Sequence, residues 1–199
     1  MKSLNAIFVA VALSFLSACS DHGVTPTGVN SSRQPGTAAS ASQASAMTGF
    51  GFNGTASGFP TGTVFLTGGG SFDLATASNV VPNEDTRVSA NGGFRCVDGV
   101  EQGPLAHCGT GEGVRWDTAQ LLASTNFKCT ATDAVKSAVT GKDTVVLLAD
   151  FYRAGDGNDE SFTAQMIVSS SDLAPNIPGE QNIWIQGVGC GTAVVHFSK

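Results

Sequence analysis

Seven side chains in two stretches of the sequence are of types that could bind a ligand or carry acid–base chemistry. They are Glu112, Arg115, Trp116 and Asp117 in the first stretch, and Asp150, Tyr152 and Arg153 in the second. The carboxylates Glu112 and Asp150 are chemically able to act as a general acid and base, although their spacing does not require it.

The second stretch continues an apolar run, where a charge is costly unless it is paired. One interpretation is a structural ion pair between Asp150 and Arg115 or Arg153, closing the end of a barrel. The other is a small polar site at a barrel mouth, shared with Tyr152 and Trp116. The sequence leaves both open.

Motifs of known catalytic and cofactor sites are missing or incomplete. G-x-S-x-G, S-x-x-K and H-E-x-x-H do not occur. Residues 49–54 match G-x-G-x-x-G, but they follow a serine-rich stretch rather than a strand. Residues 156–160 resemble the start of a calcium loop, yet Ser161 and Ile167 stand where an EF-hand needs glycine and glutamate. No nucleophile motif accompanies His107 or His196, so neither histidine is expected to act as the base of a catalytic triad. We predict no catalytic residue, metal or cofactor.

Four cysteines in the second half of the chain are expected to form disulfides. They are Cys96, Cys108, Cys129 and Cys190. An even number in an exported chain implies two bridges, and these spacings lack the close pairs of a zinc site. Three pairings are possible, of which we favour a local Cys96–Cys108 loop together with a Cys129–Cys190 bridge.

The N-terminus has the pattern of an export signal. Lys2 precedes an apolar run over residues 4–16, which is too short to span a bilayer. The run ends in Leu16-Ser17-Ala18-Cys19, which resembles the lipobox of bacterial lipoproteins. That resemblance implies removal of residues 1–18, a lipid on Cys19, and a membrane anchor, in the outer membrane if the host is Gram-negative. The alternative is an ordinary secretory peptide cut near Ala18.

Composition divides the rest of the chain into two parts. Residues 19–48 have almost no large apolar side chain and are expected to form a flexible tether, and residues 49–199 a single domain. Charged residues make up 13% of the chain, and the net charge is −6. This acidic balance argues against a nucleic-acid partner.

Within the domain, alternation of apolar and polar residues predicts strands. Residues 144–152, apolar on both faces, and 161–168 read as a long hairpin whose solvated tip includes residues 156–160. Further strands are expected over residues 63–67, 71–75, 87–96, 114–122, 124–129, 182–188 and 192–197, and a short helix over 132–139. We therefore predict an all-β domain: a single antiparallel β-barrel or sandwich of about eight or nine strands.

Three glycine-rich segments are similar to those of uncharacterised secreted bacterial β domains. They are Thr67-Gly68-Gly69-Gly70-Ser71-Phe72, Gly92-Gly93-Phe94-Arg95-Cys96 and Gly113-Val114-Arg115-Trp116-Asp117. The resemblance implies a small barrel-like module with no catalytic residues. The first hypothesis is an envelope-anchored, non-catalytic module that binds a small apolar ligand or an envelope protein. The alternatives are a structural surface protein, or a small-barrel enzyme (isomerase, cyclase or hydrolase) using Asp150, Tyr152 and Arg153, with Glu112 as a further carboxylate.

Overall fold

The computed structural model describes residues 46–153 and 160–198. Cys19 and the predicted hairpin tip at 154–159 lie outside these described residues. No helix in the described part is long and apolar enough to cross a membrane.

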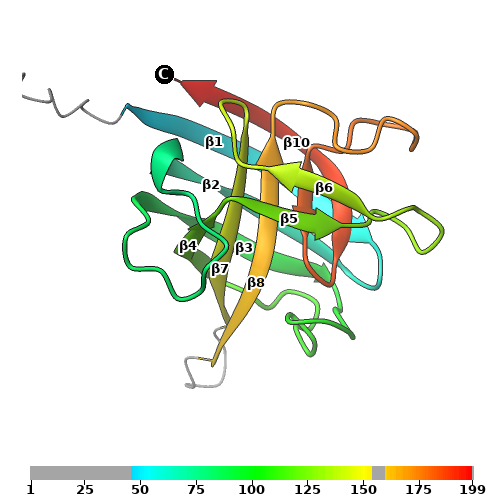
Figure 1. The fold of residues 1–199 in the computed structure, drawn as a ribbon. Coiled ribbons are helices and arrows are strands. Elements are labelled where there is room, and N and C mark those ends of the chain that lie inside the picture. Colours follow the sequence, from blue (N-terminus) through cyan, green and yellow to red (C-terminus); the bar gives the residue numbers. More distant parts are fainter. Residues whose placement is uncertain (1–45, 154–159, 199) are drawn as a thin grey trace, which may run out of the picture. The chain divides into compact units, whose positions relative to one another are not determined.

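The described chain is an all-β domain built on a closed, antiparallel barrel of eight strands, which confirms the expected fold class (Figure 1). The strands are β1 (Met47–Gly58), β2 (Thr63–Asp73), β3 (Val88–Asp98), β4 (Arg115–Leu122), β7 (Thr144–Arg153), β8 (Glu160–Ser169), β9 (Ile183–Ile185) and β10 (Gly189–Ser198). Their order around the barrel is β1-β10-β9-β8-β7-β4-β3-β2. A 3₁₀ turn, η1 (Leu74–Thr76), follows β2, and a separate sheet pairs β5 (Ser124–Phe127) with β6 (Lys136–Val139).

The barrel closes because its first and last strands pair from Gly49 opposite Ser198 to Gly58 opposite Gly189, which is the whole length of β10. β1 begins at Met47, two positions before the expected start of the domain. The G-x-G-x-x-G segment at 49–54 is part of this strand. Closure leaves the eight barrel strands without a free edge, the usual solution for an antiparallel sheet of this size.

Side chains fill the barrel interior. The pleat turns every second side chain inward, so Phe50 and Phe52 of β1 join the core, where Phe50 contacts Phe72 of β2 and Phe52 contacts Trp116 of β4. The largest fully buried members of this core are Trp116, Phe72, Phe151, Leu66, Leu105, Leu121, Leu147, Met166, Ile183 and Ile185. The interior is therefore a packed core, as in other small barrels.

Glycines make room for the largest of these side chains. The indole of Trp116 lies so close to two strands that a Cβ on Gly68 would be 2.6 Å from its Cζ2, and one on Gly92 would be 2.7 Å from its Nε1. The Trp116 Nε1–H donates to the carbonyl of Thr67 at 3.1 Å. Part of the high glycine content thus lets two strands approach a tryptophan.

A second apolar cluster lies outside the barrel, beneath the β5–β6 sheet. Val146 of β7 and Ile167 of β8 point outward and pack with Phe127 of β5 and Ala138 of β6. In Figure 1 the two short strands cross the outer side of β7 and β8. This cover explains why β7 is apolar on both faces.

Two expectations about individual elements were wrong. The helix expected over residues 132–139 is instead a turn followed by β6, whose Ala138 is buried while Val139 is exposed. Pairing with β5 and burial of one face decide the conformation of this short segment. The separate strands expected at 63–67 and 71–75 are one strand, because three glycines continue the ladder between them.

Both favoured disulfides are present. Cys96 bonds to Cys108, and Cys129 bonds to Cys190. The second bridge fastens the segment after β5 to β10, which holds the β5–β6 sheet onto the barrel.

Candidate functional site

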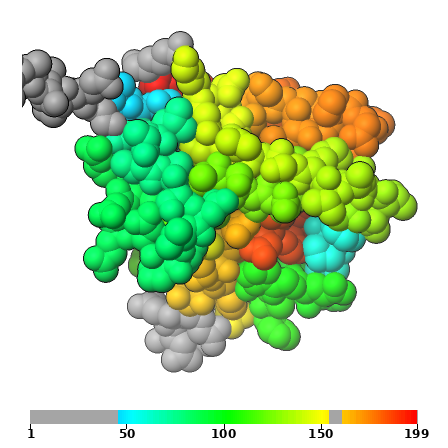
Figure 2. Space-filling view, viewed as in Figure 1, coloured from blue at the N-terminus to red at the C-terminus, as the bar shows by residue number. Residues whose placement is uncertain are grey.

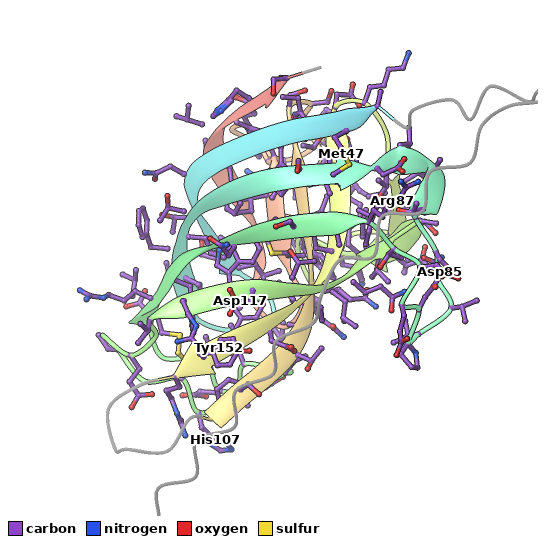
Figure 3. All side chains as sticks on the ribbon, turned by 90° about the vertical axis from the view of Figure 1, so that its left-hand side faces the viewer. Met47, Asp85, Arg87, His107, Asp117 and Tyr152 are labelled. Carbon is purple, nitrogen blue, oxygen red and sulfur yellow. A yellow bond between two sulfur atoms is a disulfide. The ribbon has the colours of Figure 1, made fainter. Side chains whose placement is uncertain are left out.

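The seven polar and aromatic residues singled out in the sequence lie in three separate places. Figure 3 shows Asp117 and Tyr152 on one outer wall of the barrel and His107 at its lower end. The separation follows from the pleat, which sends neighbouring residues of a strand to opposite faces.

Trp116 belongs to the core and not to an accessible polar site. Its side chain has 0% exposure and contacts Phe52 with ring centroids 5.9 Å apart. The charged residues on either side of it in the chain, Arg115 and Asp117, face solvent instead, with 56% and 44% of their side chains exposed. A ligand on the outer wall would therefore not reach the indole.

The outer wall carries Arg115, Asp117, Asp150 and Tyr152. Arg115 stands opposite Tyr152, with its guanidinium carbon 4.3 Å from the ring centroid, and Asp117 stands opposite Asp150. Arg115 Nε donates to Asp117 Oδ2 at 3.3 Å, and Asp150 Oδ1 accepts from the Thr163 hydroxyl at 2.7 Å. The ion pair of Asp150 with Arg115 or Arg153, one of the two interpretations of the sequence, is not among the ion pairs of the described residues.

Glu112 and Arg153 lie at the end of the barrel. Arg153 Nη1 is 3.6 Å from Glu112 Oε2 and donates to the carbonyl of His107 at 2.7 Å. Its guanidinium carbon also lies 5.4 Å from the centroid of the Phe162 ring. Arg153 thus projects to the opposite face of β7 from Asp150 and Tyr152, and none of the four grooves described below joins the three residues.

The described part of the chain instead has an apolar groove on its outer surface, along β5. The groove has a volume of about 320 Å³. It lies between the β1–β2 turn, which contributes Phe59 and Pro60, and the end of β5, which contributes Phe127 and Lys128, with Val135 and Trp184 completing its apolar lining. We call it the β5 groove. Figure 2 shows the β9–β10 region recessed between the yellow-green β5–β6 sheet and the cyan β1–β2 turn.

Trp184 forms the floor of the β5 groove. It is the central residue of β9, between Ile183 and Ile185, which face the barrel interior. The pleat therefore turns its indole outward, against the Phe127 ring at a centroid distance of 5.9 Å. Its Nε1–H donates to the carbonyl of Lys128 at 3.1 Å, which fixes the end of β5 above the floor.

A half-buried cation borders the groove. Lys128 Nζ lies 5.8 Å from the centroid of the Phe59 ring and donates to the carbonyl of Ala131 at 2.9 Å. Lys128 takes part in none of the ion pairs among the described residues. An aromatic face and an unneutralised ammonium group together favour an apolar ligand that carries a negative charge.

The loop after β5 is held in place by polar contacts as well as by the Cys129–Cys190 bridge. Lys136 Nζ lies 3.0 Å from Asp133 Oδ2, and Asn176 Nδ2 donates to Asp133 Oδ1 at 3.0 Å. These two hydrogen bonds, of which the one from Lys136 has the larger effect, hold the pKa of Asp133 below its ordinary value. The loop that carries Lys128 and Val135 is thus restrained at both ends.

Three further grooves in the described part are more polar. One of about 580 Å³ lies over the Cys129–Cys190 bridge, and one of about 430 Å³ lies beside it along β10. The third, of about 300 Å³, adjoins the β5 groove at Asn126 and is lined by Asn79, Thr125 and Gln165. None of the four is lined by Asp117, Asp150 or Tyr152.

The aromatic residues of the β5 groove were not among the candidates from the sequence. Phe59, Phe127 and Trp184 are far apart in the chain and come together only through the fold. The one available signal was Trp184 within the apolar run 183–185, because a strand buried on both faces must be covered on its outer side as well.

Comparisons of the chain with models of known protein families, with curated proteins and with solved structures found no match.

Proposed function

We propose that the protein is a non-catalytic binding module of the bacterial cell envelope, and that it binds its partner in the β5 groove. The observation that carries the proposal is the contrast between the two apolar regions of the domain. The barrel interior is filled by its own side chains, whereas the β5 groove is a hollow on the outer surface, walled by the half-buried Phe59 and floored by the largely covered rings of Phe127 and Trp184.

The groove has the chemistry of a recognition surface. Aromatic side chains give large contact area at low entropic cost and dominate the energetics of many interfaces. Lys128 supplies a charge in a chain whose net charge is −6. A partner with an apolar group and an acidic group would bury the first against Trp184 and Phe59 and place the second near Lys128.

Export and anchoring complete the proposal. The lipobox predicts that Cys19 carries the lipid, and the two disulfides suit an oxidising, exported location. With the anchor in the membrane, in the outer membrane if the host is Gram-negative, the domain would present its groove to an envelope protein or a small apolar ligand. The acidic net charge disfavours nucleic acid as a partner.

The enzyme alternative is not supported by a specific arrangement. Asp150 and Tyr152 stand on an outer wall and line none of the four grooves described above, and Arg153 points to the barrel end. General acid–base catalysis needs its groups within hydrogen-bonding reach of one substrate.

The proposal can be tested with an apolar anion, 1-anilinonaphthalene-8-sulfonate, and the mature chain made soluble by Cys19→Ser. We expect saturable binding that is lost in Phe59→Ser, because this change removes one wall of the groove. Phe65→Ser is the matched control, since Phe65 is an exposed phenylalanine (38%) on β2 and does not line the groove. Equal binding by the wild type and Phe59→Ser would refute the proposal.

A further inference from the structure

We propose that the occupant of the β5 groove is an extended peptide segment that pairs with the main chain of Asn126, places an apolar side chain over Trp184 and carries an acidic group near Lys128. This inference rests on the proposed function, and it names the class of partner and the mode of binding.

The first step is that β5 has a free edge. β5 pairs with β6 on one side, and the register places Asn126 opposite Ser137. The amide of Thr140 donates to the carbonyl of Ala123 at 2.9 Å, which shows that the main-chain groups of Ala123 point toward β6. Main-chain groups alternate along an antiparallel strand. Those of residues 124, 126 and 128 therefore point away from β6, toward the groove.

Two of these three outward positions are already used. The amide of Ser124 donates to Asn79 Oδ1 at 3.1 Å, and the carbonyl of Lys128 accepts from Trp184 Nε1 at 3.1 Å. Asn126 stands between them. No hydrogen bond to its amide is found among the described residues, and its carbonyl accepts one from the hydroxyl of the neighbouring Thr125 at 3.4 Å, which leaves the second lone pair of this oxygen for another donor. The strand edge is thus closed at both ends and open at one residue, which can exchange two hydrogen bonds with one residue of a passing chain.

The space on both sides of Asn126 fits the side chains of such a chain. Asn126 lines the β5 groove on one side and the adjoining groove of about 300 Å³ on the other. In a paired strand, the residues before and after the one opposite Asn126 point to the same face as Thr125 and Phe127, roughly 6.5–7 Å apart. One would enter the aromatic lining over Trp184. The other would meet the polar groups of Thr125 and Gln165.

Charge complementarity predicts which ligand residue lies next to the apolar one, near Lys128. Lys128, a half-buried residue, borders the aromatic end of the groove, and its ammonium group has no carboxylate partner among the ion pairs of the described residues. An acidic side chain placed there would form a charge-assisted hydrogen bond. Because a single residue exchanges both hydrogen bonds with Asn126 only in an antiparallel pair, the expected ligand has, from its N-terminal to its C-terminal side, an acidic residue, a large apolar residue, one intervening residue and a small polar residue. Binding of this kind is strand addition, in which main-chain bonds supply affinity and pockets supply specificity.

The experiment selects peptides from a random ten-residue phage-displayed library on the mature Cys19→Ser chain, with Phe59→Ser as the counter-selection. Enriched peptides are synthesised and N-methylated one residue at a time. We expect a large apolar residue and an acidic residue in the enriched sequences. Methylation of the residue opposite Asn126 should weaken binding about tenfold, and methylation of its neighbours should have little effect.

Variants of the protein give the matched control. Asn126→Pro removes the outward amide and should weaken binding about tenfold or more, whereas Asn126→Ala keeps the amide and should change binding less than threefold. Because this amide is outside the β5–β6 ladder, proline is expected to leave the fold intact, which near-ultraviolet circular dichroism checks. If it does not, the methylated peptides still decide the question.

The outcomes separate this inference from the proposed function. Peptides whose affinity is indifferent to N-methylation at every position would overturn strand pairing. Failure to enrich any peptide, with 1-anilinonaphthalene-8-sulfonate bound in a Phe59-dependent manner, would overturn the peptide and leave the groove as a site for small apolar anions. If neither a peptide nor 1-anilinonaphthalene-8-sulfonate binds, both proposals are wrong.

Discussion

Replacing Trp116 by alanine tests whether the barrel interior is a packed core. A buried tryptophan removes about 150–250 Å² from water, which at about 25 cal/mol per Å² corresponds to about 4–6 kcal/mol. Measured losses for such truncations are about 3–5 kcal/mol. We therefore expect Trp116→Ala to lower the free energy of unfolding by about 4 kcal/mol and the melting temperature by roughly 8–16 °C.

The neighbouring residue in the chain provides the control. Arg115 is on the opposite face of β4, and its ion pair with Asp117 is exposed to solvent, so Arg115→Ala should cost less than about 1 kcal/mol. Trp116→Phe keeps most of the ring volume but loses the hydrogen bond to Thr67, and should cost about 1–2 kcal/mol.

The assay is urea unfolding followed by far-ultraviolet circular dichroism, because tryptophan fluorescence is altered by the substitutions themselves. A loss below 1 kcal/mol for Trp116→Ala would refute the packed core. So would similar losses for Trp116→Ala and Arg115→Ala, because the pleat would then not separate them. Either result would reopen the interior as a place for a ligand.

Two further predictions concern the elements that hold the groove. Opening the Cys129–Cys190 bridge by Cys190→Ser should lower the free energy of unfolding more than opening the Cys96–Cys108 bridge by Cys108→Ser. The first bridge closes the longer loop, with a sequence separation of 61 against 12. The chain-entropy model gives about 4 and about 3 kcal/mol, and urea unfolding of both variants checks the order. Hydrogen bonds from a lysine and an asparagine keep the pKa of Asp133 below its ordinary value of 3.8. Because the folded state favours the ionised Asp133 carboxylate, this group stabilises the fold at pH values above its ordinary pKa. That stabilisation is lost as the pH falls through the lower pKa of the folded state. The stability difference between the wild type and Asp133→Asn should therefore shrink on acidification from pH 7 to pH 3, and a constant difference would contradict this account.

Much of the fold could be predicted from the sequence because it follows from local patterns. Alternation in β8 and the doubly apolar run of β7 identify an antiparallel hairpin whose first strand is covered on both sides. Cysteine spacing favoured the observed pairing. The helix expected over 132–139 failed because these few residues have weak local preferences, and pairing with β5 decides their conformation.

The functional surface was harder to predict, for two physical reasons. The candidate polar residues were grouped by nearness in the chain, although the period of two in a strand places Trp116 inside and Arg115 and Asp117 outside. The β5 groove joins Phe59, Phe127 and Trp184 from three distant segments, and they come together only through the closed barrel and the β5–β6 sheet packed on it.

The most direct test of the central claim uses the fluorescence of Trp184. The chain has two tryptophans, so Trp116→Phe leaves Trp184 in the floor of the groove as the reporter. In the mature Cys19→Ser chain we predict a saturable change in Trp184 emission as 1-anilinonaphthalene-8-sulfonate is added, absent when Phe59→Ser is introduced and retained with Phe65→Ser. Emission that stays constant on titration, or that changes equally in the Phe59→Ser variant, would contradict the β5 groove as the binding site.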